Sequence, residues 1–128
     1  MSYGFSKTVL LSYERAIERV TEELTKEGFG VLTTIDVKEI LKKKLNVDFN
    51  KYIILGACNP SFAHQALQAE EQIGLLLPCN VIVYEKDGKT VVSAFDPMSM
   101  TRVMDNEAVR PIAEEVRAKL ERVINAVR

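Results

Sequence analysis

The chain has a single histidine, two cysteines and a formal net charge of only −1 over its 128 residues. No basic face stands out, so we expect no nucleic-acid partner. No apolar run approaches the roughly 20 residues that cross a bilayer, so no membrane partner is expected either. Residues 1–4 lack the basic start of a secretion signal. Two cysteines without such a signal predict a protein of the reducing cytoplasm.

Motifs of catalysis are also scarce. No glycine-rich phosphate loop follows the first predicted strand, and no Ser-His-Asp order or paired acid–base constellation is present. The sequence therefore identifies no reaction, and its length and its 47% hydrophobic content indicate one globular domain over residues 1–128.

Apolar patterning predicts the elements of this domain. Strands are expected at 5–11, 30–35, 52–57, 81–84 and 90–95, with Asp87-Gly88 at the tip of a hairpin between the last two. Helices are expected at 12–28, 36–44, 59–74 and 111–127. This order favours an α+β fold with an antiparallel or mixed sheet of about five strands and helices mainly on one face. A doubly wound parallel sheet is the alternative.

Helix signals support several of these boundaries. Asp36 followed by Glu39 resembles a capping box, and Ile40 and Leu41 would form the inward face of the helix that it opens. In the last helix, apolar residues recur every three or four positions, so we expect this helix to supply much of the core, with Leu120 buried.

The candidate site lies where the third strand ends. Asn59 is expected to cap the next helix through its side-chain oxygen, with Pro60 at the first helical position. Cys58 directly precedes the start of that helix, so its thiol is expected to feel the positive end of the helix dipole. This should lower the pKa of the thiol and raise its fraction of reactive thiolate. If the third and fourth strands are antiparallel neighbours, Cys58 and Cys79 lie at the same end of the sheet. His64, early in the intervening helix, would then overhang them.

Several interpretations of these residues remain open. Cys58 and Cys79 can simply fill the core as small apolar side chains. Alternatively, Cys58, Asn59, His64 and Cys79 form a ligand-binding or reactive-thiol site. Cys58, His64 and Cys79 are also suitable ligands for zinc with an open fourth position, although their spacing matches no compact zinc motif.

Four segments carry a resemblance to a known family. They are GFGV at 28–31, GACNP at 56–60, LLPCNV at 76–81 and DP at 96–97. Over nearly the whole chain the sequence resembles the domain-of-unknown-function family 302. The resemblance implies a β-α-β-rich domain similar in fold to one half of the TATA-binding protein, often found as a dimer. It implies no activity and no DNA binding.

Three methionines, Met98, Met100 and Met104, follow the last strand in an irregular segment. They can form a flexible apolar surface for a partner or fill the core under the last helix, and we favour the interface. The leading hypothesis is therefore a cytoplasmic homodimeric module that binds a small ligand or a partner. The alternative is a thiol- or metal-dependent site built on Cys58, Cys79 and His64.

Overall fold

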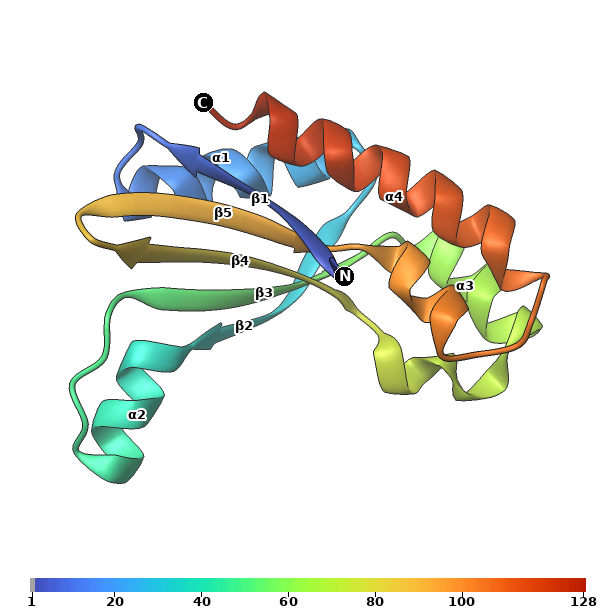
Figure 1. The fold of residues 1–128 in the computed structure, drawn as a ribbon, viewed down its shortest axis with the longest axis horizontal. Coiled ribbons are helices and arrows are strands. Elements are labelled where there is room, and N and C mark those ends of the chain that lie inside the picture. The colour runs from blue at the N-terminus through green and yellow to red at the C-terminus, as the bar shows by residue number, and fades with distance from the viewer. Residues whose placement is uncertain (1) are drawn as a thin grey trace.

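Strands and helices largely alternate along the chain in the computed structural model, which describes residues 2–128 (Figure 1). The strands are β1 (Gly4–Val9), β2 (Gly30–Asp36), β3 (Tyr52–Cys58), β4 (Cys79–Lys86) and β5 (Lys89–Phe95). The α-helices are α1 (Tyr13–Lys26), α2 (Val37–Leu45), α3 (Pro60–Ala69) and α4 (Val109–Ala126). Two 3-10 segments, η1 (Glu71–Leu76) and η2 (Pro97–Arg102), follow α3 and β5.

The described strands form one sheet in the order β1-β5-β4-β3-β2, and every neighbouring pair is antiparallel. This confirms the predicted α+β fold and excludes the parallel doubly wound alternative. The hairpin between β4 and β5 turns at Asp87 and Gly88, whose φ angles are 53° and 74°. Two consecutive positive φ values are typical of the tight turn that matches the strand twist, as the Asp-Gly pair predicted.

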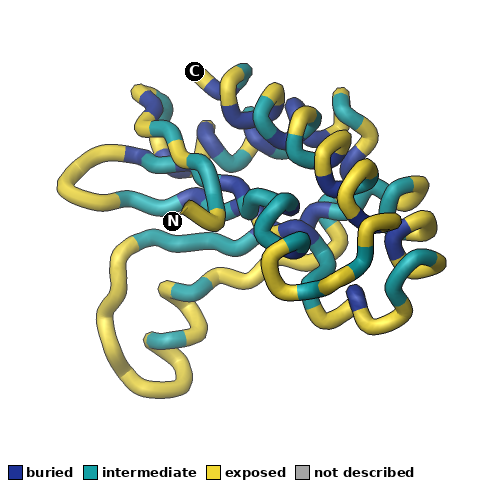
Figure 2. Tube along the Cα trace, turned by 45° about the vertical axis from the view of Figure 1, so that its right-hand side comes forward, coloured by how far each residue is buried: buried dark blue, intermediate teal, exposed yellow. Residues whose placement is uncertain are grey.

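One face of the sheet is covered by α1 and α4, and the main core lies between them and the strands (Figures 1 and 2). Val20 and Leu24 of α1 and Leu120 of α4 are fully buried there. Lys7 of β1 fastens the end of α4, because its Nζ donates to the carbonyl oxygens of Asn125 at 3.1 Å and Val127 at 2.7 Å. The predicted core role of the last helix is confirmed.

The three methionines belong to a second core cluster. Met100 is buried beside Ile73 and Val109, and Met98 and Met104 pack against the same cluster half-buried. The expectation of an exposed methionine surface is therefore wrong. The short helix η2 turns Met100 beneath α4, where it fills the core.

The opposite face of the sheet carries a projecting segment, α2 and the connection after it, residues 37–49, which we call the arm. The arm extends from the ends of β2 and β3 on the side away from α1 and α4 (Figures 1 and 2). No residue of α2 is buried by the described part of the chain. Ile40 is exposed and Leu41 is half-buried, so the described part of the chain covers the expected inward face only in part, where α2 contacts β3.

Local capping confirms some predicted boundaries and corrects others. The Asp36 side chain accepts a hydrogen bond from the Glu39 N–H at 3.0 Å, as the capping box predicted. The third helix was predicted to continue to residue 74, but α3 ends at Ala69. There Asn106 donates from Nδ2 to the Ala69 carbonyl oxygen at 2.7 Å, and Glu70 takes an extended conformation. The chain continues into η1, a separate short turn.

Candidate thiol pocket

Strand register brings the two cysteines to one end of the sheet. β3 and β4 are antiparallel neighbours, and Ala57 is paired with Cys79. Cys58, the next residue and the last of β3, therefore lies diagonally across from Cys79, the first residue of β4. The conditional prediction that both cysteines lie at the same sheet end is confirmed.

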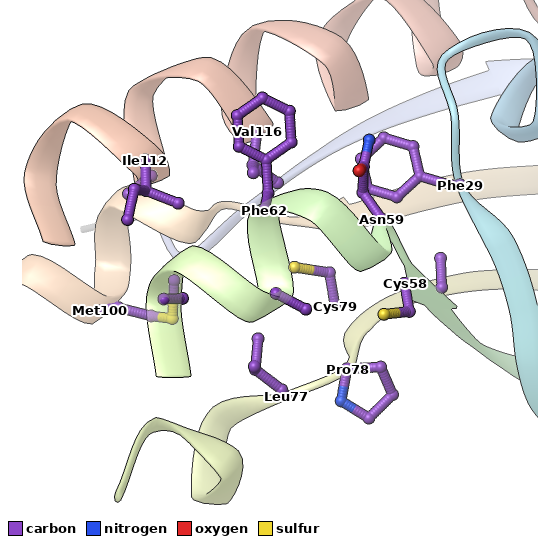
Figure 3. A pocket seen from close by; sticks show the side chains of 14 residues that line it. Phe29, Cys58, Asn59, Phe62, Leu77, Pro78, Cys79, Met100, Ile112 and Val116 are labelled. Atoms are coloured by element: carbon purple, nitrogen blue, oxygen red, sulfur yellow. The ribbon is translucent and has the colours of Figure 1, made fainter. Parts of the chain in front are cut away.

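Both cysteines line one pocket between the sheet end and the helices (Figure 3). Phe62 of α3, Met100 of η2 and Val116 of α4 contribute to its apolar walls. The cavity measures about 40 Å³. One water needs roughly 10–15 Å³ on this scale, so the cavity holds a few water molecules at most. Sequence reasoning did not find these walls, because no local pattern indicates that residues 62, 100 and 116 converge.

The two thiols have different surroundings. Cys79 is 6% exposed, whereas Cys58 is only partly covered. Burial raises the pKa of the Cys79 thiol to about 12, and the nearby Cys58 adds to this rise because a second negative charge is unfavourable. Cys79 therefore remains protonated at neutral pH. Cys58, which is separated from α3 by the N-cap residue Asn59, is the more accessible thiol of the two.

His64 does not join the cysteines. It lies in α3 but is exposed to solvent, and it is not among the residues that line the pocket. Residues 2–128 contain no group of three histidine, cysteine, aspartate or glutamate side chains placed to hold a metal ion. The expected zinc ligands Cys58, His64 and Cys79 are thus not assembled, because the exposed face of α3 turns His64 away.

Asn59 has a different role from the predicted one. Among the described residues its side chain makes no capping bond to α3. Instead its Nδ2 donates to the carbonyl oxygen of Glu27 at 3.3 Å, at the end of α1. Gly28, with φ of 87°, turns the chain beside it, and a Cβ there would lie 3.1 Å from the Asn59 Nδ2. Asn59 therefore joins the end of α1 to the start of α3. Pro60 opens α3 as predicted.

Comparison with known proteins agrees with this architecture. The family model described as "Domain of unknown function DUF302" matches residues 5–127. The chain belongs to the DUF302 family. A crystal structure of an uncharacterized conserved DUF302 protein from Bacillus stearothermophilus is similar to it over 100% of both chains, with a TM-score of 0.94 and 31% sequence identity. No curated protein matches the chain.

Membership of DUF302 establishes the fold and indicates no function. Within residues 2–128, no helix combines the length and the apolar character required to cross a membrane. Two features of this DUF302 chain remain as candidates for a role: the pair of unequally exposed thiols and the exposed arm.

Proposed function

We propose that the protein is a cytoplasmic binding module that works as a homodimer. The arm is the observation that carries this proposal. Its apolar side chains Ile40, Leu45, Val47 and Phe49 are exposed, and Leu45 retains 65% of its accessible surface. A helix as short as α2 is marginal in water unless an apolar face packs on something. A second copy of the chain would supply that packing.

Total surface area supports the same proposal. A folded monomer of this mass, 14.4 kDa, is expected to expose about 6,800 Å². The chain exposes 7682 Å². The excess is close to the roughly 800 Å² that each partner buries in an interface of standard size. One additional protein surface is therefore enough to bring the exposed area to the expected value.

The thiol pocket itself leaves no room for a sizeable small molecule. At about 40 Å³ it lacks the room that a drug-sized ligand requires, roughly 300 Å³ or more. The proposed compartment follows from the two free cysteines, since the reducing cytoplasm keeps thiols unpaired.

The dimer is tested by sedimentation equilibrium over a wide range of concentrations. The unaltered protein is expected to sediment as a dimer at high concentration, and Leu45→Asp to sediment as a monomer, because the arm cannot bury a carboxylate. Leu10→Asp is the matched control: Leu10 is fully exposed between β1 and α1, so this variant should remain dimeric. A monomeric unaltered protein at every concentration would reject the proposal.

A reactive thiol at Cys58 is the second candidate, and the unequal exposure of the two cysteines favours it. With a thiol reagent on the folded protein, we expect Cys58 to label faster than Cys79, since Cys79 is buried and protonated. Cys58→Ser should slow total labelling more than Cys79→Ser. Equal rates limited by unfolding would instead identify both cysteines as inert core residues.

A further inference from the structure

We propose that the arm of each copy packs on the uncovered sheet face of its partner, so that two arms are exchanged reciprocally. This inference rests on the proposed dimer and adds where its interface lies. The uncovered face is the face opposite α1 and α4. Its location follows from strand alternation, because Leu55, Val81 and Val83 point into the core and their neighbours along each strand point away.

An apolar and aromatic strip crosses the middle of this face. Tyr52 is paired with Tyr84 and Ile54 with Ile82 across β3 and β4. The two tyrosine rings stack with their centroids 5.3 Å apart and an interplanar angle of 13°. All four side chains are half-buried. Tyrosine is enriched at protein interfaces, where its large ring loses little conformational entropy on contact.

Hollows border this strip on both sides. One is lined by Phe49, Asn50, the two tyrosines and the β4–β5 hairpin, and the other by the two tyrosines, Ile82 and the start of β1. A third hollow lies beyond Asn80, next to Leu75, which is 82% exposed. The apolar strip therefore lies between shallow hollows whose outer walls are largely polar. Apolar side chains of an arm would contact the strip, and polar side chains of the arm would face the outer walls.

Symmetry explains why the occupant is a second copy. In a two-fold dimer every contact occurs twice. The arm of each chain covers the sheet face of its partner, so all arms and sheet faces of the dimer are covered by one kind of contact. The arm borders the uncovered face at its end, because the Phe49 ring lies 6.3 Å from the ring of Tyr52, centroid to centroid, and both rings line the same hollow. The excess area of the chain also matches one partner's share of a standard interface.

Isotope-mixed photocrosslinking tests the location. Natural-abundance and ¹⁵N-labelled chains carrying benzoylphenylalanine at position 45 are mixed, allowed to exchange and irradiated. Mass spectrometry is expected to find crosslinks of mixed isotope composition from position 45 to peptides that contain Tyr52–Ile54 or Ile82–Tyr84. Benzoylphenylalanine at position 10 is the matched control and should give no such intermolecular product.

The outcomes separate the two proposals. A dimer whose mixed crosslinks lead to α1 or α4, or whose position 45 links only within its own chain, overturns the arm exchange and leaves the dimer standing. A monomer in sedimentation overturns both. As an independent measurement, Ile82→Ser should raise the dimer dissociation constant at least about tenfold, equivalent to 1.4 kcal/mol. An unchanged constant in a folded variant also overturns the exchange.

Discussion

The two sides of the sheet use similar amphipathic sequence in different ways. On the covered side, Val20 and Leu24 of α1 and Leu120 of α4 lose all their accessible surface. On the other side, Leu45 of α2 keeps 65% of it, although it belongs to a comparable apolar stripe. A stripe shows which face of a helix needs burial. What covers that face is decided by the rest of the chain or by another chain.

This contrast has an energetic consequence. Segments with few buried contacts open locally at low free-energy cost, whereas core elements open only when the whole domain unfolds. In a monomer we therefore expect the arm to fluctuate independently of the covered side. The same kind of substitution should therefore lower the free energy of global unfolding more on the covered side than in the arm.

The largest expected difference is between Leu120→Ala and Leu45→Ala. Leu120 is fully buried, so its truncation should lower the free energy of unfolding by roughly 2–5 kcal/mol. Leu45→Ala should change it by about 0.5 kcal/mol or less, as for other surface substitutions. Urea melts at concentrations low enough to keep the chain monomeric measure both. A loss below about 1 kcal/mol for Leu120→Ala would contradict the assigned core.

The next difference concerns the two left-handed helix ends, Gly28 after α1 and Asn46 after α2, with φ of 87° and 54°. Gly28→Ala should lower the free energy of unfolding by about 1–2 kcal/mol, because alanine disfavours this backbone conformation. Its Cβ would also crowd Asn59.

Asn46→Ala meets a related backbone cost in the arm. We expect it to reduce hydrogen-exchange protection of the α2 amides while the urea midpoint stays nearly constant, because the arm opens separately. Equal losses of global stability in Gly28→Ala and Asn46→Ala would show that the arm unfolds together with the core.

The smallest difference is between two ion pairs. Arg122 donates to Glu27 from Nε at 3.1 Å and from Nη2 at 2.9 Å. These hydrogen bonds lower the pKa of Glu27 below its ordinary value of 4.5. The stabilisation is therefore complete above pH 4.5 and is lost as the pH falls through the lower, folded-state pKa. In urea melts at a series of pH values, Arg122→Gln should reduce the loss of unfolding free energy that accompanies acidification below pH 4.5.

The arm provides the comparison in Lys42 and Asp48, which are 3.3 Å apart and largely exposed. Lys42→Gln should change the free energy of unfolding less than Arg122→Gln does, since solvent screens so exposed a pair. An identical change in Lys42→Gln and Arg122→Gln would remove the distinction between the two sides.

Local sequence was sufficient for much of the fold. The Asp87-Gly88 turn predicted the β4–β5 hairpin, and the capping signals at Asp36 and Pro60 predicted where two helices begin. The periodicity of the last helix predicted the burial of Leu120. Each of these signals depends on residues only a few positions apart, so its physical cause can be read from the local sequence.

The candidate site was less predictable, because its contacts are distant in sequence. Asn59 satisfies the carbonyl group of Glu27, 32 residues earlier, in preference to the helix that follows it. Asn106 ends α3 from 37 residues away. No local sequence pattern indicates that a residue so distant in the chain will take part in these hydrogen bonds. The position of His64 on the exposed side of α3 depended in the same way on where that helix packs.

The bond from Lys7 to the end of α4 bears on how the protein is made. The first strand pairs with β5, and its lysine holds carbonyl groups 118 and 120 positions later in the chain. On the ribosome, β1 and α1 emerge long before these partners exist. The apolar stripe of α1 packs on β4 and β5 as well as on α4, so it is fully covered only after α4 has left the exit tunnel. The covered side can therefore be completed only after the residues of α4 have been synthesised.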